Sequence, residues 1–157
     1  MLLRKSSLIC CVLLAGANVF AAGPRIDITA QLIGYDLVQA TGAPSENTEL
    51  PRITVRAGSE GIIEVSRDFK YGQHGFRRLA HLGIRMPVYV QMGEDGKLRF
   101  LLRAELCERQ DPADPTSAVL KMTTSFDGQA LPGKPRIIQV TTPNGKQATL
   151  QITFTPR

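Results

Sequence analysis

The sequence predicts an all-β fold: a single domain built as a sandwich of antiparallel strands. Apolar and polar residues alternate with a period of two along several short stretches, which is the pattern of strands that bury one face. Turn sequences rich in glycine and proline separate these stretches, and the chain holds 14 glycines and 10 prolines. No long stretch repeats its apolar residues at helical spacing. We therefore expect two packed sheets with roughly seven to nine strands.

The first expected strand covers residues 26–32, where isoleucine, alanine and leucine alternate with aspartate, threonine and glutamine. The second and third cover residues 53–56 and 63–66, where isoleucine and valine alternate with polar residues. The sequence Ala-Gly-Ser-Glu-Gly at 57–61 predicts a turn between them. The segment 41–50 is polar and contains a glycine and a proline, so we expect a loop there.

The later part of the chain continues the pattern. Residues 93–97 predict a hairpin loop between strands at 88–91 and 98–103, and the Asn-Gly pair within 143–146 predicts a tight turn. Segment 111–116 predicts a loop, because its two prolines lack the amide that a central strand donates. The remaining expected strands contain Leu120 and Met122, then Ile138 and Val140, then Leu150, Ile152 and Phe154.

The best helix candidate covers residues 75–82, where apolar residues could share one face over one or two turns. The inward-facing positions of the strands predict the core. The expected core residues are Ile28, Ala30, Leu32, Ile53, Val55, Ile63, Val65, Val88, Val90, Leu102, Leu106, Ile138, Val140, Leu150 and Ile152.

The N-terminus has the layout of a secretory signal peptide. Arg4 and Lys5 precede a stretch without charges at 6–19, and small residues follow. The apolar stretch is shorter than the ~20 residues that span a bilayer. We expect cleavage after Ala21, which leaves one β domain over residues 22–157 without a transmembrane segment, exported to the periplasm or the exterior. An uncleaved N-terminal anchor is the alternative.

The charge and the cysteines narrow the choice of partners. Without Arg4 and Lys5 the chain keeps 17 basic and 14 acidic residues, a net charge of +3. This excess is too small to favour a nucleic-acid partner. Cys107 is the one cysteine outside the signal peptide, so no disulfide is expected within the mature chain. It is expected to be a small buried apolar residue, with a reactive or dimer-forming thiol as the alternative.

The sequence does not predict an enzyme, a cofactor or a metal site. His74 and His81 would share a helical face only in a continuous helix, which Gly75 disfavours. The serines lack the glycine context of a nucleophile elbow, and no glycine-rich phosphate loop is present. Glu105 and Glu108 lie close in sequence, but a useful acid pair needs burial or mutual approach. Solvated strand ends are the expected environment of both.

The polar segment with the most distinctive composition runs from residue 67 to 85. It concentrates basic residues among histidines and aromatic residues. Such a segment could bind an anionic envelope ligand, either a lipid headgroup, lipopolysaccharide or an acidic protein. The alternative is a solvated loop whose charges keep the protein soluble and block edge-to-edge pairing. The candidate binding residues are Arg67, Lys70, Arg77, Arg78 and Arg85.

Several segments carry a resemblance to a known family. Residues 50–65 combine a proline, a basic residue, a β-branched strand, a turn and an alternating strand. Residues 83–90 hold a glycine, an apolar strand and a proline, and 95–106 a turn and a strand. Residues 134–142 and 144–152 form a closing hairpin pattern. In this order the segments resemble the core β-domain of bacterial secretins, the outer-membrane pores of type II and type III secretion systems.

The resemblance extends over roughly residues 26–154. It implies a small stand-alone relative of the secretin core domain: a non-catalytic structural or interaction protein of the cell envelope. Because that fold assembles through sheet edges, the resemblance implies binding to a protein partner, or to itself, by strand addition. The alternative function is binding of an anionic envelope component through the basic segment 67–85. Steep weakening at high salt would indicate the alternative.

Overall fold

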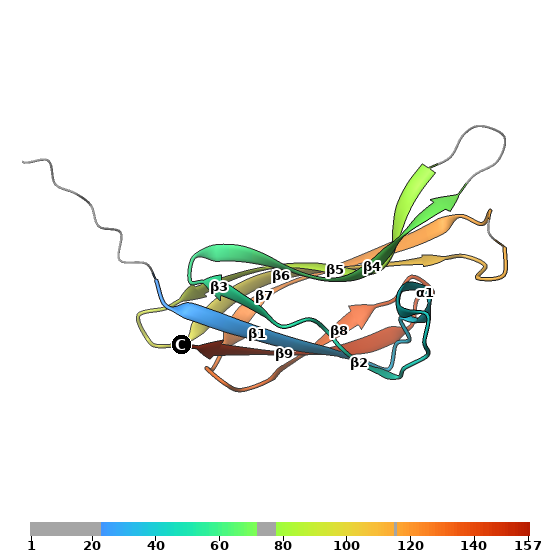
Figure 1. Ribbon diagram of the computed structural model, residues 1–157. Helices are drawn as coiled ribbons and strands as arrows, with labels where there is room; N and C mark the ends of the chain where they lie inside the picture. Colours follow the sequence, from blue (N-terminus) through green and yellow to red (C-terminus); the bar gives the residue numbers. More distant parts are fainter. Residues whose placement is uncertain (1–22, 72–77, 115) are drawn as a thin grey trace, which may run out of the picture.

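A computed structural model describes residues 23–71, 78–114 and 116–157. Figure 1 shows two antiparallel sheets packed face to face, which confirms the predicted all-β sandwich. One sheet, here called sheet A, has five strands, and the other, sheet B, has four. A single short helix, α1 (Val38–Thr41), follows the first strand within this part of the chain.

Sheet A is organised around β1 (Arg25–Ile33). One side of β1 pairs with two short strands in succession, β3 (Ile53–Arg56) and β2 (Asn47–Glu49). The other side pairs with β9 (Gln147–Pro156), and β9 pairs in turn with β8 (Arg136–Thr141). Along β9, buried residues alternate with half-buried ones, as expected for a sheet with one face against a core.

Sheet B is a meander of four long strands in chain order. It consists of β4 (Ser59–Tyr71), β5 (Arg78–Met92), β6 (Leu98–Arg109) and β7 (Val119–Ala130). Each neighbouring pair is antiparallel. As a consequence β4 and β7, the two edge strands, run in opposite directions.

The core lies between the two sheets. Phe100 of sheet B joins them, because its ring lies 4.8 Å from the ring of Phe154 in sheet A and 5.7 Å from that of Phe126. The predicted core residues are buried, except that Ile53, Val55 and Val65 are half-buried and pack against it. Other fully or nearly fully buried members are Ile26, Ile84, Met86, Leu98, Phe100 and Phe154.

The predicted turns connect the strands as expected. The loop at 93–97 joins β5 to β6, and the amide of Gly93 donates to the carbonyl of Lys97 at 2.8 Å. The loop at 143–146 joins β8 to β9, where Gly145 has a φ of 80° that favours glycine. The turn at 57–61 is tighter than predicted, since β4 already begins at Ser59.

Two sequence predictions were wrong. The helix expected at 75–82 is not formed over residues 78–82, which belong to β5; residues 75–77 lie outside the described part of the chain. Pairing with β4 over this stretch outweighs a weak helical pattern that glycines flank. The segment 41–50 is also not a plain loop, because it contains the end of α1 and the edge strand β2.

Sheet B divides into two hairpins at Gly83. The pairing of β5 with β6 ends with Gly83 opposite Cys107, whereas β4 and β5 stay paired as far as Tyr71 and Arg78. Gly83 has a φ of 126°, and a Cβ there would lie 2.1 Å from the carbonyl oxygen of Val65 and 2.8 Å from the Cβ of Ala40 in α1. Figure 1 shows the β4–β5 hairpin bending away from β6 and β7 beyond α1.

Candidate interaction surface

The outer face of sheet B carries rows of side chains that cross the strands. One row runs from Glu64 to Arg85, Glu105 and Thr123, one residue from each strand in order. The row beside it ends at Lys121, opposite Cys107. These positions face solvent because the residues between them along each strand point into the core.

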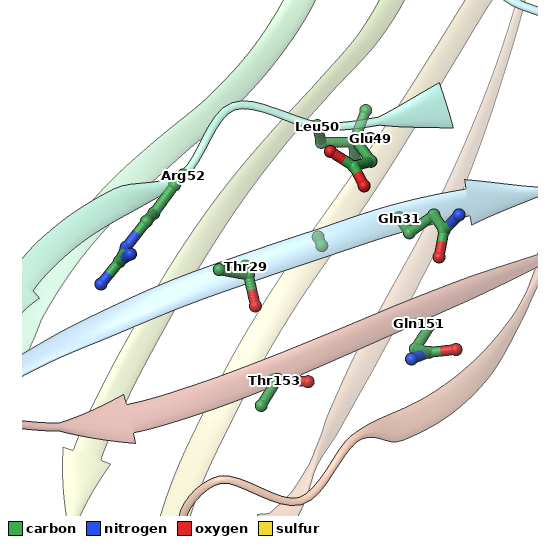
Figure 2. Close-up of a pocket in the computed structure, with 8 residues that line it drawn as sticks. Thr29, Gln31, Glu49, Leu50, Arg52, Gln151 and Thr153 are labelled. Carbon is green, nitrogen blue, oxygen red and sulfur yellow. The ribbon is translucent and has the colours of Figure 1, made fainter. Parts of the chain in front are cut away.

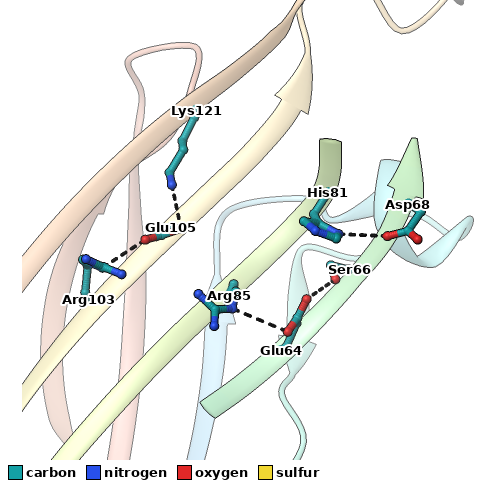
Figure 3. Close-up of polar contacts among 8 residues, drawn as sticks. All are labelled: Glu64, Ser66, Asp68, His81, Arg85, Arg103, Glu105 and Lys121. Atoms are coloured by element: carbon teal, nitrogen blue, oxygen red, sulfur yellow. Dashed lines mark hydrogen bonds and ion pairs between the residues drawn. The ribbon is translucent and has the colours of Figure 1, made fainter. Parts of the chain in front are cut away.

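Charges of opposite sign alternate along this part of the face. Glu64 lies 3.8 Å from Arg85. Glu105 accepts a hydrogen bond from Lys121 at 2.7 Å and forms an ion pair with Arg103 at 2.9 Å. Figure 3 shows these contacts as two groups, one between β4 and β5 and one on β6 and β7. We call Glu64, Arg85, Glu105 and Lys121 the charge ladder. Its signs are negative, positive, negative and positive from β4 to β7.

Glu105 is the most enclosed member of the charge ladder, with 12% of its side chain exposed. The hydrogen bond from Lys121 holds the pKa of Glu105 below its ordinary value, and the charges of Lys121, Arg103 and Arg85 add to this effect. The carboxylate therefore stays ionised at neutral pH. Its role is to pair with cations on β6 and β7, and not to act as a general acid.

An apolar band lies next to the charge ladder on the same outer face. Pro87 and Tyr89 occupy the centre of the sheet, flanked by Ile62 on β4 and Leu101 on β6. The exposed fractions of Ile62, Tyr89 and Leu101 are 43%, 36% and 54%. Large exposed apolar residues that gather on one face are typical of interaction surfaces.

The edges of sheet B are long. β4 has 13 residues and β7 has 12, and neither contains a proline. On the sides that face away from β5 and β6, the described residues provide no strand paired with β4 or β7 in a ladder. Rows of free amides and carbonyls of this kind are templates for pairing with another strand.

The predicted basic residues do not form one convergent patch. Arg67 and Lys70 lie three residues apart on β4, so their side chains leave opposite faces of the hairpin. Arg78 lies opposite Tyr71 at the start of β5, whereas Arg85 lies seven residues further along β5, opposite Glu64 in the charge ladder. Arg77 lies outside the described residues. The segment 67–85 is therefore mostly a strand hairpin and not a loop.

The residues with reactive side chains lie on the same part of sheet B. His81 contacts Asp68 at 2.9 Å, but their side chains are 58% and 68% exposed. Burial raises the pKa of the Cys107 thiol, which disfavours the nucleophilic thiolate. Glu105 and Glu108 point to opposite faces, and Glu108 accepts a hydrogen bond from Tyr35 at 2.5 Å. This arrangement does not resemble an activated nucleophile and base.

Sheet A carries a separate hollow of about 420 Å³ on its outer face. Figure 2 shows threonine and glutamine side chains of β1 and β9 beneath the segment that links β2 to β3. Glu49 is the one carboxylate among its lining residues, and Arg52 the one cation. The hollow offers polar contacts, but not the paired groups that acid–base chemistry needs.

Two further properties of the described residues bear on the site. Residues 23–71, 78–114 and 116–157 contain no group of three or more histidine, cysteine, aspartate or glutamate side chains placed to hold a metal ion. Within the same residues, no helix has the length and apolar character to cross a membrane.

The charge ladder was missed by sequence reasoning, which chose Arg85 as a candidate binding residue and considered Glu105 only as a partner of Glu108 at a solvated strand end. The signal was present but depended on register. Once the 93–97 loop fixes the pairing of β5 with β6, Arg85 falls opposite Glu105. Lys121 could then be placed only by knowing how β7 pairs across the loop at 111–116.

Comparison with known proteins rests on structure. No family model matches the chain, and no curated protein matches it. The type II secretin GspD from enteropathogenic Escherichia coli is similar over 85% of this chain and 65% of its own, with 12% identity and a TM-score of 0.51.

The secretin domain of InvG from the Salmonella SPI-1 injectisome is similar over 85% of this chain and 61% of its own, with 12% identity and a TM-score of 0.50. The chain spans less than two thirds of either structure. At this identity the likeness concerns the fold, and the resemblance predicted from residues 26–154 is confirmed at that level. This chain has a secretin-like fold.

Proposed function

We propose that this chain is a non-catalytic structural protein of the cell envelope that associates with further copies of itself through the edges of sheet B. The observation that carries the proposal is the pair of long, proline-free edge strands, β4 and β7. The secretin-like fold supports it, since secretins assemble through sheet edges.

The directions of the edge strands suit this association. β4 and β7 run in opposite directions, because three antiparallel steps separate them. When copies are related by rotation about a common axis, β7 of one copy lies antiparallel to β4 of the next. The alternation of directions then continues from copy to copy, and backbone hydrogen bonds carry the affinity. The interface joins two different surfaces, so it repeats into a ring or a filament.

The proposed location is the periplasm or the exterior of the cell. It rests on the predicted signal peptide, with cleavage after Ala21 and a single β domain at 22–157. A strand from another protein could occupy either edge in the same way. The anionic-ligand alternative receives less support, because Arg67, Lys70 and Arg78 do not share one face.

Light scattering across a range of protein and salt concentrations tests the proposal. The full chain is expressed with its own leader, the exported form is purified, and its mass identifies the cleavage site. We expect a multimer that persists at high salt, because backbone pairing depends little on ionic strength. A monomer at every concentration contradicts self-association. Binding of anionic vesicles that disappears as salt rises supports the alternative.

A further inference from the structure

The charge ladder ends at both edges of sheet B with opposite signs. Glu64 stands on β4, and Lys121 stands on β7. Lys121 is 53% exposed, and its ammonium group carries three donors, of which Glu105 uses one. The Glu64 carboxylate accepts from the Ser66 hydroxyl and lies 3.8 Å from Arg85, but it has about four lone-pair sites and about 38% of its side chain is exposed. Each end of the ladder therefore retains capacity to bind the other.

We propose that Lys121 of one copy lies opposite Glu64 of the next copy, so that the charge ladder continues across the interface and fixes its register. This inference rests on the proposed function, because it requires β7 to pair with β4 of a second copy. It names the register of that pairing, which strand directions alone leave open.

The allowed registers of β7 against β4 of the next copy differ from one another by two residues. A shift by one residue would turn the core-facing side chains of β7 toward the outer face, next to the outward side chains of β4. The three nearest registers place Lys121 opposite Ser66, Glu64 or Asp68 of the neighbouring copy. The charges of the remaining outward residues distinguish these three.

Ser66, Gly83, Cys107 and Lys121 form one row across sheet B. If each row continues straight into the next copy, Lys121 lies opposite Ser66 of that copy. In this register Asp127 falls opposite Glu60, since both belong to the row that contains Tyr89 and Leu101. Like charges directly opposite one another destabilise a strand pair. The level register is therefore disfavoured.

The register with Lys121 opposite Asp68 has two costs. It places Asp127 opposite Ile62, a carboxylate beside an exposed apolar side chain. It also uses a carboxylate that lies beyond the bend at Gly83. A strand that pairs there must follow the hairpin away from the rest of the sheet.

The register with Lys121 opposite Glu64 avoids both costs. Val119 to Phe126 then pair with Ser66 to Ser59, so the β4 residues used run from the level of Gly83 toward the end where β4, β5 and β6 form one continuous sheet. Thr123 falls opposite Ile62, and Asp127 passes beyond the first residue of β4. The ladder continues with alternating signs through any number of copies.

Charge reversal with mixing tests the ladder. We expect Lys121→Glu and Glu64→Lys each to weaken self-association by about tenfold, because each places like charges at every interface. A mixture of the two variants should regain association, since alternating copies offer one reversed and one original pair. Lys146→Glu and Glu94→Lys, in turns away from the β4 and β7 edges, are matched controls that keep the wild-type affinity.

Cysteine cross-linking tests the register in the same assembly. Directly opposite residues have Cα atoms within the range that a disulfide spans. In a Cys107→Ser background, Lys121→Cys with Glu64→Cys should give a series of covalent multimers on a non-reducing gel. Lys121→Cys with Ser66→Cys, or with Asp68→Cys, should cross-link far less.

The two experiments separate the inference from the proposed function. A wild-type protein that assembles, but cross-links through residue 66 or 68, overturns the register and leaves edge association intact. Mixed variants that stay dissociated, while both fold normally, overturn the ladder alone. A wild-type protein that is monomeric throughout overturns both proposals.

Discussion

The two sheets of the sandwich end in different ways. Sheet A is bounded by strands of three, four and six residues, with Pro51 between β2 and β3 and Pro135 immediately before β8. Sheet B is bounded by strands of 13 and 12 residues without a proline. Short strands and prolines protect an edge from pairing. One chain therefore protects the edges of one sheet and leaves those of the other available.

The largest expected effect concerns the contact that holds the two sheets together. Phe154→Ala removes the sheet A ring that packs 4.8 Å from Phe100 of sheet B. Because Phe154 is fully buried, we expect the free energy of unfolding to fall by about 3–5 kcal/mol. Urea unfolding followed by two spectroscopic probes should still give one transition. Separate transitions would mean that the sheets are independent units.

The second-largest expected effect is on self-association, and it is measured by making the same substitution on an edge strand of each sheet. Ile62 on β4 and Ile137 on β8 are both exposed, by 43% and 56%. Ile62→Lys should weaken self-association by roughly 1 kcal/mol, since it adds a cation near Lys121 of the neighbouring copy. Ile137→Lys should leave association unchanged. Equal effects in light scattering would contradict a special role for the edges of sheet B.

The smallest expected effect is on the pH dependence of stability, and it concerns Asp27 at the β1–β3 edge of sheet A. Asp27 is buried, accepts a hydrogen bond from Thr54 at 2.6 Å, and pairs with Arg52 and with Arg157. The Thr54 hydroxyl, more than the arginine charges, holds the pKa of Asp27 below its ordinary value. A lowered pKa stabilises the fold above the pKa of the unfolded chain, and this contribution is lost as the pH falls through the folded value.

Asp27→Asn should therefore lower the melting temperature at pH 7, and the difference from wild type should shrink below about pH 4. Melting curves over this pH range, measured by circular dichroism, check the prediction. Association through sheet B should not change at neutral pH, because β3 and β1 lie in the other sheet. A difference that grows on acidification would contradict the assigned role.

The strands were predictable where local pattern and tertiary environment agree. Alternation at Ile28, Ala30 and Leu32 identified β1, and the Asn-Gly pair at 144–145 identified the β8–β9 turn. The distal part of the β4–β5 hairpin was missed, because its apolar spacing also fits a helix and only pairing with β4 selects the strand.

The candidate site was less predictable than the fold. Basic residues are visible in the sequence, so Arg67, Lys70 and Arg85 were chosen by type and proximity. The charge ladder is defined by contacts across strands: Glu105 meets Lys121 from 16 residues away, over a loop whose length does not fix register. Edge strands cannot be identified from alternation either, since a central strand with one polar face shows the same pattern.

Gly83 also divides β5 into two parts, residues 78–82 and 83–92, and the number of neighbours that each part contacts limits how far its sequence can change. From Gly83 to Val90, β5 lies between β4 and β6, and every second residue also packs in the core. On the distal side, Arg78 to Leu82 pair with β4 alone. Leu82 is fully buried, but substitutions at the exposed residues of this stretch disturb fewer neighbours than substitutions at the buried residues between Gly83 and Met92. The exposed positions Arg78, Leu79 and His81 are therefore where new binding specificity would arise at the least cost to stability.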